Sequence, residues 1–415
     1  MRIIYLHQFF HTPERSGGTF SYDLARRLVD RGHEVRVVTS DMHALHRGWR
    51  VTEHSGIQIH WRGIAYSNRM SYARRLLSFA QFVFSASRRA ACLPGDVLHA
   101  VSPPLTTALP AIRAANKKGI PLVLEACDLW PATAIAVGAL RSRPLVAAAR
   151  WMERYAYRTA AHITGTSPDT AAGVVASGVP WEKVTYIPMR SDVEAFRVPA
   201  KEGERFRRSR PWLQHRPLVV YTGAFGLVNG CQYLVRLAAA TRRRDPQVRF
   251  LLVGAGREEQ IIRRLAEQLG VLGVNLFIEP PVPRSEIPAI LSAADLATST
   301  VIDREPLWAC SPSKLFDALA AGRPIAINHQ GWLARLIRVN RCGMVWDAHQ
   351  VESVVEPLIH FLEHEARAAG LRARRLAETQ FDADLSVQKL EAIFCRLTGI
   401  EPPRQSQPAT LRRAA

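Results

Sequence analysis

The sequence predicts an α/β protein made of two doubly wound domains, each with a parallel sheet covered by helices on both faces. Short runs rich in branched apolar residues alternate with amphipathic helical segments, first over residues 2–166 and again over 218–347. Between these series, residues 189–216 are highly charged and have little periodicity. At 415 residues the chain is also too long for one compact core.

The first domain, residues 1–190, begins with a strand, a loop and a helix. Residues 2–6 form the first apolar run, a helix is expected over 21–31, and Gly32 ends it before the strand at 34–39. Polar residues, Gly or Pro punctuate the remaining strands of this domain, which are expected at 57–61, 96–101, 121–126 and 161–166. This alternation is typical of a doubly wound sheet.

Residues 191–216 are expected to form the interdomain linker, and residues 217–380 the second domain. An amphipathic helix is predicted over 381–400, and the polar, Pro-rich and basic residues 401–415 are expected to form a disordered tail. The strands of the second domain are expected at 218–223, 249–256, 275–279, 296–301, 324–328 and 343–347.

A formal net charge of +19 indicates an anionic partner: a membrane surface, a nucleic acid or a phosphorylated substrate. The apolar residues of segment 73–90 lie between two arginine pairs, which suits either an interfacial membrane helix or a core helix with snorkelling arginines. No basic stripe interleaved with aromatic residues supports nucleic-acid binding. The six scattered cysteines favour reduced thiols in a cytoplasmic protein, and no run has the features of a signal peptide or a membrane span.

Residues 311–324 predict one helix whose first turn binds a ligand. Ser311 and Pro312 are the expected N-cap and first-turn pair, and the free N–H groups of a helix start favour an anion. Lys314 suits a diphosphate, and the Asp317 carboxylate suits a pair of sugar hydroxyls. An ordinary capped amphipathic helix would have the same pattern.

Two glycine loops follow predicted strands, where α/β proteins gather their binding sites. Gly17 and Gly18 allow a ligand to approach the backbone before the first helix, although a tight turn explains them as well. Gly254 and Gly256 follow another strand, but the third glycine of a dinucleotide fingerprint is missing. The sequence therefore gives little support to a nicotinamide site.

Asp128 follows the strand at 121–126 and suits two roles. Its carboxylate could orient an acceptor hydroxyl or take its proton, with His99 and Glu125 on neighbouring strand ends. Capping of the next helix explains Asp128 equally well. Elsewhere, the pair formed by residues 382 and 384 has the D-x-D spacing of a metal site, but its position at a helix start favours capping.

Together, five segments resemble the retaining nucleotide-sugar glycosyltransferases of family 4, and among them bacterial fucosaminyl and N-acetylhexosaminyl transferases of surface-polysaccharide synthesis. These segments are residues 17–39, 128–138, 221–226, 251–256 and 311–325. The resemblance implies the GT-B architecture, in which two Rossmann-like domains face a cleft and the last helix crosses back to the first domain. It also implies that the C-terminal domain holds most of the donor, that the N-terminal domain holds the acceptor, and that no catalytic metal takes part.

The resemblance also implies residue roles. Lys314 would neutralise the leaving diphosphate, and Asp317, the second acid of the family's E-x7-E pair, would bind the ribose. The chain departs from the family at Ala309, where the first acid is missing, and over 223–230, where many members have an Arg and a Lys. The further donor contacts expected are Gly17, Gly18, Gly223, Gly254, Gly256, Arg257, Val282, Arg284, Glu305, Ser311, Ser313 and Leu315, and those expected on the acceptor side are Arg15, Thr19, His99 and Glu125.

These features favour a metal-independent retaining hexosyltransferase with no cofactor besides its nucleotide-sugar donor. The expected reaction moves an N-acetylhexosamine from a UDP donor to a lipid-linked or saccharide acceptor, with Asp128 and Lys314 as the catalytic candidates. The expected location is the cytoplasm, at the inner face of the membrane. Two alternatives remain: a nucleotide-sugar 2-epimerase of the same fold, and a basic protein that binds anionic lipid or nucleic acid without chemistry.

Overall fold

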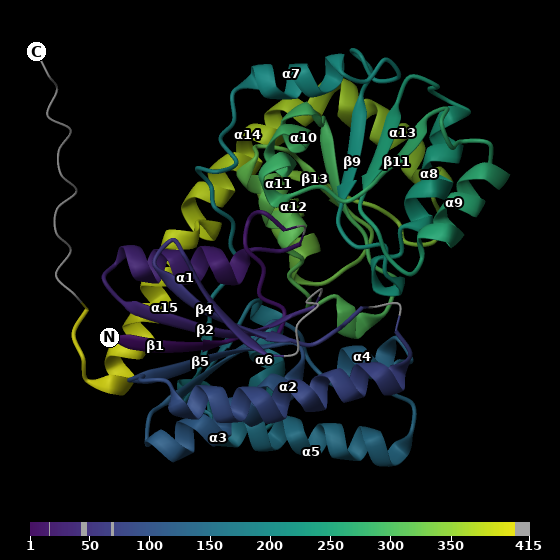
Figure 1. Ribbon diagram of the computed structural model, residues 1–415. Helices are drawn as coiled ribbons and strands as arrows, with labels where there is room; N and C mark the ends of the chain where they lie inside the picture. The colour runs from purple at the N-terminus through teal and green to yellow at the C-terminus, as the bar shows by residue number, and fades with distance from the viewer. Residues whose placement is uncertain (16, 43–47, 68–69, 403–415) are drawn as a thin grey trace, which may run out of the picture.

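The computed structural model describes residues 1–15, 17–42, 48–67 and 70–402. Two α/β domains lie against each other, with the N-terminal domain below the C-terminal domain in the view of Figure 1. The predicted tail at 401–415 lies almost wholly outside the described residues. None of the described helices is both long and apolar enough to span a bilayer.

The N-terminal domain contains an eight-stranded sheet in the order β3-β4-β2-β1-β5-β6-β7-β8. All neighbouring strands are parallel except β3 and β4, which form an antiparallel pair at one edge. The strands are β1 (Arg2–Leu6), β2 (Glu34–Asp41), β3 (Trp49–His54), β4 (Ile57–Gly63), β5 (Val97–Ser102), β6 (Leu122–Ala126), β7 (His162–Gly165) and β8 (Val184–Tyr186).

Helices cover both faces of this sheet, which confirms the predicted doubly wound arrangement. Ile3 and Tyr5 of β1 belong to one apolar cluster with α1, and Ile4 and Leu6 belong to another with α2, α3, α5 and α6, because successive strand side chains point to opposite faces. The helices are α1 (Phe20–Asp30), α2 (Tyr72–Cys92), α3 (Ala108–Lys118), α4 (Ala132–Ala136), α5 (Arg143–Thr159) and α6 (Pro168–Ala176).

The C-terminal domain contains a six-stranded parallel sheet in the order β11-β10-β9-β12-β13-β14, and each strand falls within its predicted range. Its strands are β9 (Leu218–Thr222), β10 (Arg249–Val253), β11 (Leu276–Glu279), β12 (Leu296–Ser299), β13 (Ile325–Ile327) and β14 (Gly343–Val345). Its helices are α8 (Gln232–Arg242), α9 (Glu259–Gln268), α10 (Ile287–Ala293), α11 (Ser313–Ala320), α12 (Trp332–Asn340), α13 (Glu352–His360) and α14 (Ala366–Leu376).

Two short edge strands, β3 and β8, were not predicted. Strand β3 has no buried residue, so its sequence lacks the apolar alternation of a strand that packs on the core. Strand β8 has only three residues. Both strands depend on pairing with a neighbour that is already part of the sheet.

The expected linker at 191–216 contains a helix, α7 (Ala200–Arg208), which was not predicted. This helix packs on α10: Arg207 forms an ion pair with Asp295 at 2.7 Å, and a Cβ at Gly203 would come within 2.6 Å of the Ser292 backbone. The sequence did not reveal the helix because most of its nine residues are charged and only Gly203 is buried, so it lacks the apolar stripe of a core-facing helix.

The last helix, α15 (Ala383–Thr398), returns to the N-terminal domain and lies beside α1 (Figure 1). Asp382 caps it through the Asp384 N–H, as predicted. Across the contact, Arg27 pairs with Asp384 at 2.7 Å, and Glu391 accepts from both Arg31 and His33. These ion pairs fasten the returning chain to the first domain.

The chain passes between the domains twice, and the two crossings are hydrogen-bonded to each other. The Ser191 N–H donates to the Phe381 carbonyl, and the Ala383 N–H donates to the Ser191 carbonyl, both at 3.2 Å. One apolar cluster extends from α1 through Phe196 and Phe381 to Phe316 of α11. The two domains therefore share a packed core at this seam.

A buried ion pair holds the first crossing on the N-terminal sheet. Arg190, at 3% exposure, donates to Glu125, at 2% exposure, over 3.1 Å, and His99 contacts the other oxygen of this carboxylate at the same distance. Burial alone would raise the pKa of Glu125, but the charge of Arg190 and the hydrogen bond from His99 lower it to about 2.

Replacing Glu125 by Ala should lower the free energy of unfolding by about 3 kcal/mol, because it leaves the Arg190 guanidinium buried without its counter-charge. Chemical denaturation measures this loss. The matched control is Glu34→Ala, which removes an exposed Glu–Arg pair with Arg36 and should cost less than about 1 kcal/mol. Equal losses in the two variants would contradict the structural role assigned to the buried pair.

Candidate functional site

A cavity of about 540 Å³ opens where the two domains meet, at the carboxyl ends of β9 and β10 and at the start of α11. The loop before α1 supplies its N-terminal wall. Nine of the predicted site residues line it: Gly17, Gly18, Gly223, Gly254, Val282, Arg284, Ser313, Lys314 and Asp317. Residues far apart in the sequence therefore meet in one place, as the carboxyl edges of parallel sheets allow.

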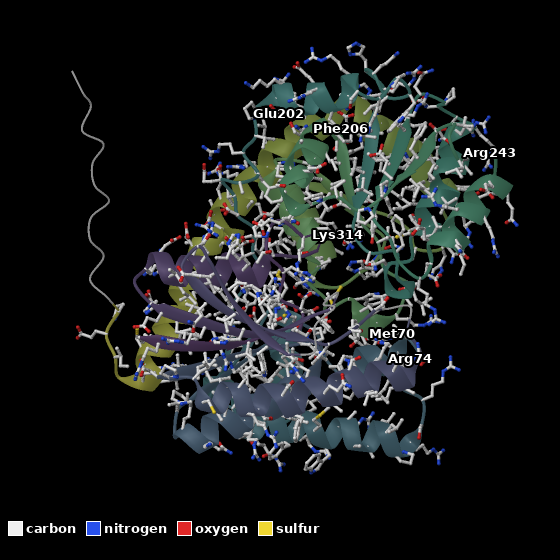
Figure 2. All side chains as sticks on the ribbon, viewed as in Figure 1. Met70, Arg74, Glu202, Phe206, Arg243 and Lys314 are labelled. Carbon is white, nitrogen blue, oxygen red and sulfur yellow. The ribbon has the colours of Figure 1, made fainter. Side chains whose placement is uncertain are left out.

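Lys314 lies in the middle of this site, between the two domains in Figure 2. Its Nζ donates to the Tyr221 hydroxyl at 3.0 Å and to the Asn229 amide oxygen at 3.2 Å. Burial lowers the pKa of Lys314. With two of its three N–H groups bonded to neutral partners, the ammonium is directed but not neutralised.

Gly223 makes room for this lysine. Its φ is +145°, and a Cβ at this position would lie 2.7 Å from Lys314 Cε. Any larger residue at 223 would therefore push the ammonium out of place and strain the backbone. The sequence showed a glycine after a strand, and the structure gives the reason for it.

Asp317 lines the same cavity, but its carboxylate already has partners. Arg284 donates two hydrogen bonds to it, at 2.5 and 2.6 Å, and the Ser191 hydroxyl donates a third at 2.9 Å. A carboxylate offers about four lone-pair positions, so only one remains for a ligand. The sequence analysis expected Arg284 to contact the donor and did not predict that Arg284 or Ser191 would bind the Asp317 carboxylate.

Helix α11 begins one residue later than predicted. Pro312 occupies the N-cap position, and no side chain caps the helix. Ser311, the expected cap, instead donates its hydroxyl to the Thr166 carbonyl of the N-terminal domain at 2.9 Å. The Leu315 N–H already donates to the Pro312 carbonyl at 3.0 Å, so the first-turn N–H groups that remain at the cavity are those of Ser313 and Lys314, which line it.

The segment before α11 is also fastened to the N-terminal domain. The Ala309 carbonyl accepts from the Ser167 hydroxyl at 2.7 Å and from the Thr170 hydroxyl at 3.3 Å, both at the start of α6. Ala309 is the position where the first family acid is missing. Its main chain joins the two domains, whereas its methyl side chain offers nothing polar to a ligand.

Five predicted donor contacts, Ser311 among them, do not line the cavity. Leu315 is fully buried in the core, and Gly256 packs so closely on Phe225 that a Cβ would lie 2.3 Å from its carbonyl oxygen. Arg257 and Glu305 are exposed outside the cavity. These four positions and Ser311 correct the expected set of donor contacts. Helix periodicity and loop packing turn these residues away from the cavity, and both depend on the three-dimensional path of the chain.

The four predicted acceptor-side residues are also engaged elsewhere. Arg15 pairs with Asp41 at 3.2 Å, and the Thr19 hydroxyl donates to Asp23 at 3.0 Å. His99 and Glu125 lie inside the sheet with Arg190, away from the cavity. Their position on neighbouring strands was predicted correctly, but the side chains point under α15 and not into the cleft, as the contact of His99 with Phe394 shows.

Asp128 lies at the carboxyl end of β6, outside the cavity of Lys314. It is half-buried, and its carboxylate makes no hydrogen bond or ion pair with the described residues. The alternative that it caps the next helix is not realised, because Pro131 occupies that position. Burial raises the pKa of Asp128 to about 6.

Several lining residues were not predicted. His11 forms part of the N-terminal wall beside Gly17, and Thr222 and Asn229 flank Lys314. Asn229 lies in the segment 223–230, which lacks the family's Arg and Lys. This departure from the family pattern was the one sign in the sequence that Asn229 could belong to the site. No group of three His, Cys, Asp or Glu residues within the described chain is placed to hold a metal ion.

The sequence matches two family models that together span most of the chain. Residues 17–190 match the glycosyl transferase 4-like domain, and residues 203–378 match glycosyl transferases group 1. A relative from Escherichia coli K12, named as a colanic acid biosynthesis glycosyl transferase, WcaI, is 25% identical over 342 residues, which are 78% of this chain and 82% of the relative. A GDP-mannose-dependent phosphatidylinositol monomannoside mannosyltransferase of Mycobacterium tuberculosis H37Rv is 27% identical over 237 residues, 55% of this chain and 60% of the relative.

Solved structures show the same fold. Sucrose-phosphate synthase of Thermosynechococcus elongatus aligns with a TM-score of 0.78 at 16% identity, over 96% of this chain and 99% of that one. HepE of Anabaena, solved with UDP and glucose, aligns with a TM-score of 0.69 at 17% identity, over 96% and 100%. The two family matches, the two facing parallel-sheet domains and the cavity between them lead to one conclusion: the chain is a glycosyltransferase of family 4 with the GT-B fold.

Proposed function

We propose that this glycosyltransferase moves a sugar, an N-acetylhexosamine, from a UDP donor with retention of configuration and without a metal ion. The observation that supports this most directly is the convergence of an ammonium, an uncapped helix start and a glycine loop on one interdomain cavity. All three favour a diphosphate. UDP is the nucleotide bound in the HepE structure, whereas the mycobacterial relative is named for GDP-mannose.

In this proposal Lys314 and the first turn of α11 receive the negative charge that develops on the diphosphate as the glycosidic bond breaks. Tyr221 and Asn229 hold the ammonium in place before the donor arrives, so little reorganisation is needed in the transition state. The sugar passes through an oxocarbenium-like state. A phosphate oxygen of the leaving group takes the acceptor proton.

The nucleoside end of the donor meets the pair of Arg284 and Asp317, beside Val282. The remaining lone pair of Asp317 can accept one ribose hydroxyl, while free N–H groups of Arg284 donate to ligand oxygens. Asp128, which has no partner among the described residues, orients the acceptor hydroxyl from the N-terminal side. This assignment replaces the acceptor role first expected of His99 and Glu125.

We also propose that the acceptor is used at the membrane face. The outer helices α2, α3 and α5, named here the basic layer, expose apolar side chains such as Phe84 and Trp151. Such a surface suits an anionic bilayer. Its charges are almost all positive, with only Glu153 opposing Arg74, Arg75, Arg88, Arg89, Arg113, Lys117, Lys118, Arg143, Arg150, Arg154 and Arg158.

Lys314→Met should weaken UDP binding by roughly tenfold to a hundredfold and slow sugar transfer by a further factor of about 100, because the lost charge acts mainly on the leaving group. Calorimetry with UDP and GDP and release of UDP from UDP-N-acetylglucosamine measure the two effects. Lys389→Met, on the exposed side of α15, is the matched control and should change neither. Normal transfer by Lys314→Met would refute the role of this lysine.

Asp128→Asn should raise the melting temperature by a few degrees at pH 8, and the gain should vanish as the pH falls toward 4. The pKa of Asp128 is raised to about 6 in the folded protein, so the native state bears the cost of an ionised buried carboxylate only above this value. Asp96→Asn should behave oppositely, because hydrogen bonds from Arg2 lower the pKa of Asp96 and stabilise the charged form. Matching pH profiles would contradict the assignment.

The full chain should float with vesicles containing about a third phosphatidylglycerol at low salt, and binding should fall steeply between about 0.05 and 0.5 M salt. Neutral phosphatidylcholine vesicles should retain little protein. Replacing Arg150 and Arg154 of α5 by Gln should weaken flotation, whereas replacing Arg243 and Arg244 of the C-terminal domain should not. Equal flotation with both lipids would exclude electrostatic docking through the basic layer.

A further inference from the structure

An apolar groove of about 540 Å³ runs between α2 and α3 on the outer side of the N-terminal domain. The two helices lie side by side at the base of the molecule in Figure 1. The groove is separate from the donor cavity and shares no lining residue with it. Its apolar lining includes Leu76, Phe79, Ala80, Val83, Phe84 and Leu109.

This groove exists because α2 has apolar residues on two faces. Phe82 is fully buried against the sheet, whereas Leu76 is 59% exposed and Phe84 is 61% exposed. The sequence left open whether residues 73–90 form a core helix or an interfacial one, and the structure shows one face packed on the core and another that exposes apolar side chains. Exposed apolar residues gathered along one groove mark a binding surface more than scattered ones do.

The groove starts at the cleft side of the domain. Parallel strands end at one edge of the sheet, and α3 follows directly after the carboxyl end of β5, just as the loop with Gly17 follows β1. Leu76 and Thr106 are therefore at the end of the groove near the cleft, and Arg88 and Arg113 are at the far end. Figure 2 shows Met70, just before α2, and Arg74, in its first turn, on the side of the N-terminal domain that faces the C-terminal domain.

The charges around the groove favour a lipid in an anionic membrane. The Arg88 guanidinium lies over the Phe84 ring at 4.1 Å, and Arg113 flanks the same end. Neither forms an ion pair with a described carboxylate. Because this end is far from the cleft, we expect the two arginines to contact the headgroups of neighbouring anionic lipids, and not the phosphate of the bound lipid, while their stems cover hydrocarbon.

We propose that the groove between α2 and α3 binds the hydrocarbon chain of a lipid-linked acceptor, whose phosphate-sugar head then lies at the cleft. The acceptor class rests on the proposed function, but chain binding can be measured without it. The groove volume is within the range of small-ligand sites, roughly 300–1,000 Å³. Because one end opens toward the cleft, the groove suits the chain of a substrate better than that of a bulk phospholipid.

The test uses farnesyl phosphate with a photoreactive benzophenone at its far end, carried in phosphatidylcholine vesicles that contain about a third phosphatidylglycerol, to which the protein is expected to bind. Irradiation of the full-length protein should label peptides of α2 and α3. Ala80→Trp fills the groove and should reduce this labelling by roughly tenfold, the effect of returning a few methylene groups to water. The control is Ala148→Trp, which adds the same bulk at an exposed position of α5 and should leave labelling within about twofold of wild type.

Three results would overturn the proposal: labelling outside α2 and α3, equal labelling of Ala80→Trp and wild type, or equally strong labelling of the groove by a photoreactive phosphatidylcholine. The last result would make the groove a general bilayer contact. Thermal shifts with UDP, measured on all three proteins, show that the fold and donor site are intact. Absence of a UDP shift in wild type would refute the proposed donor but leave the labelling result readable.

Discussion

The domain arrangement depends on two neighbouring residues that point into different domains. Arg190 is directed into the N-terminal sheet, where it neutralises Glu125, and Ser191 is directed to Asp317 on the donor helix. The main chain of Ser191 also bonds both sides of the returning chain at Phe381 and Ala383. Arg190 and Ser191 therefore fix both the seam between the domains and one wall of the cavity. A buried ion pair suits this position, since each charge would be costly without the other.

This arrangement determines what the cavity offers to a ligand. Asp317 accepts three hydrogen bonds from Arg284 and Ser191, and Lys314 donates two of its N–H groups to uncharged partners. The negative charge in the cavity is thus compensated internally, whereas the ammonium is not. Together with the uncapped start of α11, this leaves a site that favours an anion. The cation at this helix start is the Lys314 ammonium, which Tyr221 and Asn229 hold in a defined direction.

The two faces and the carboxyl edge of the N-terminal sheet carry different features of the domain. One face is closed by α1 and α15 and contains the buried cluster of His99, Glu125 and Arg190. The other face carries the helices of the basic layer, and the carboxyl edge of the sheet faces the cleft. The proposed lipid groove and the proposed donor site thus approach the same edge from different sides. A lipid-linked acceptor fits this geometry without any rearrangement of the sheet.

The sequence by itself determined the two doubly wound domains, the strands of both cores, the returning helix and most of the glycines and charges around the cavity. Those features follow from hydrophobic periodicity and from chain breaks, which are local properties. It also singled out Lys314 and Asp317, because both lie on the first turns of one helix.

Only the tertiary structure decided which side chains use their hydrogen bonds on each other. Arg284 and Ser191 reach Asp317 from sequence separations of 33 and 126 residues, and Ser311 turns away to Thr166 of the other domain. No local pattern encodes such pairs, since they arise from the meeting of two independently patterned domains. Strand β3 and helix α7 were missed because neither has a row of buried apolar residues: β3 has none, and in α7 only Gly203 is buried.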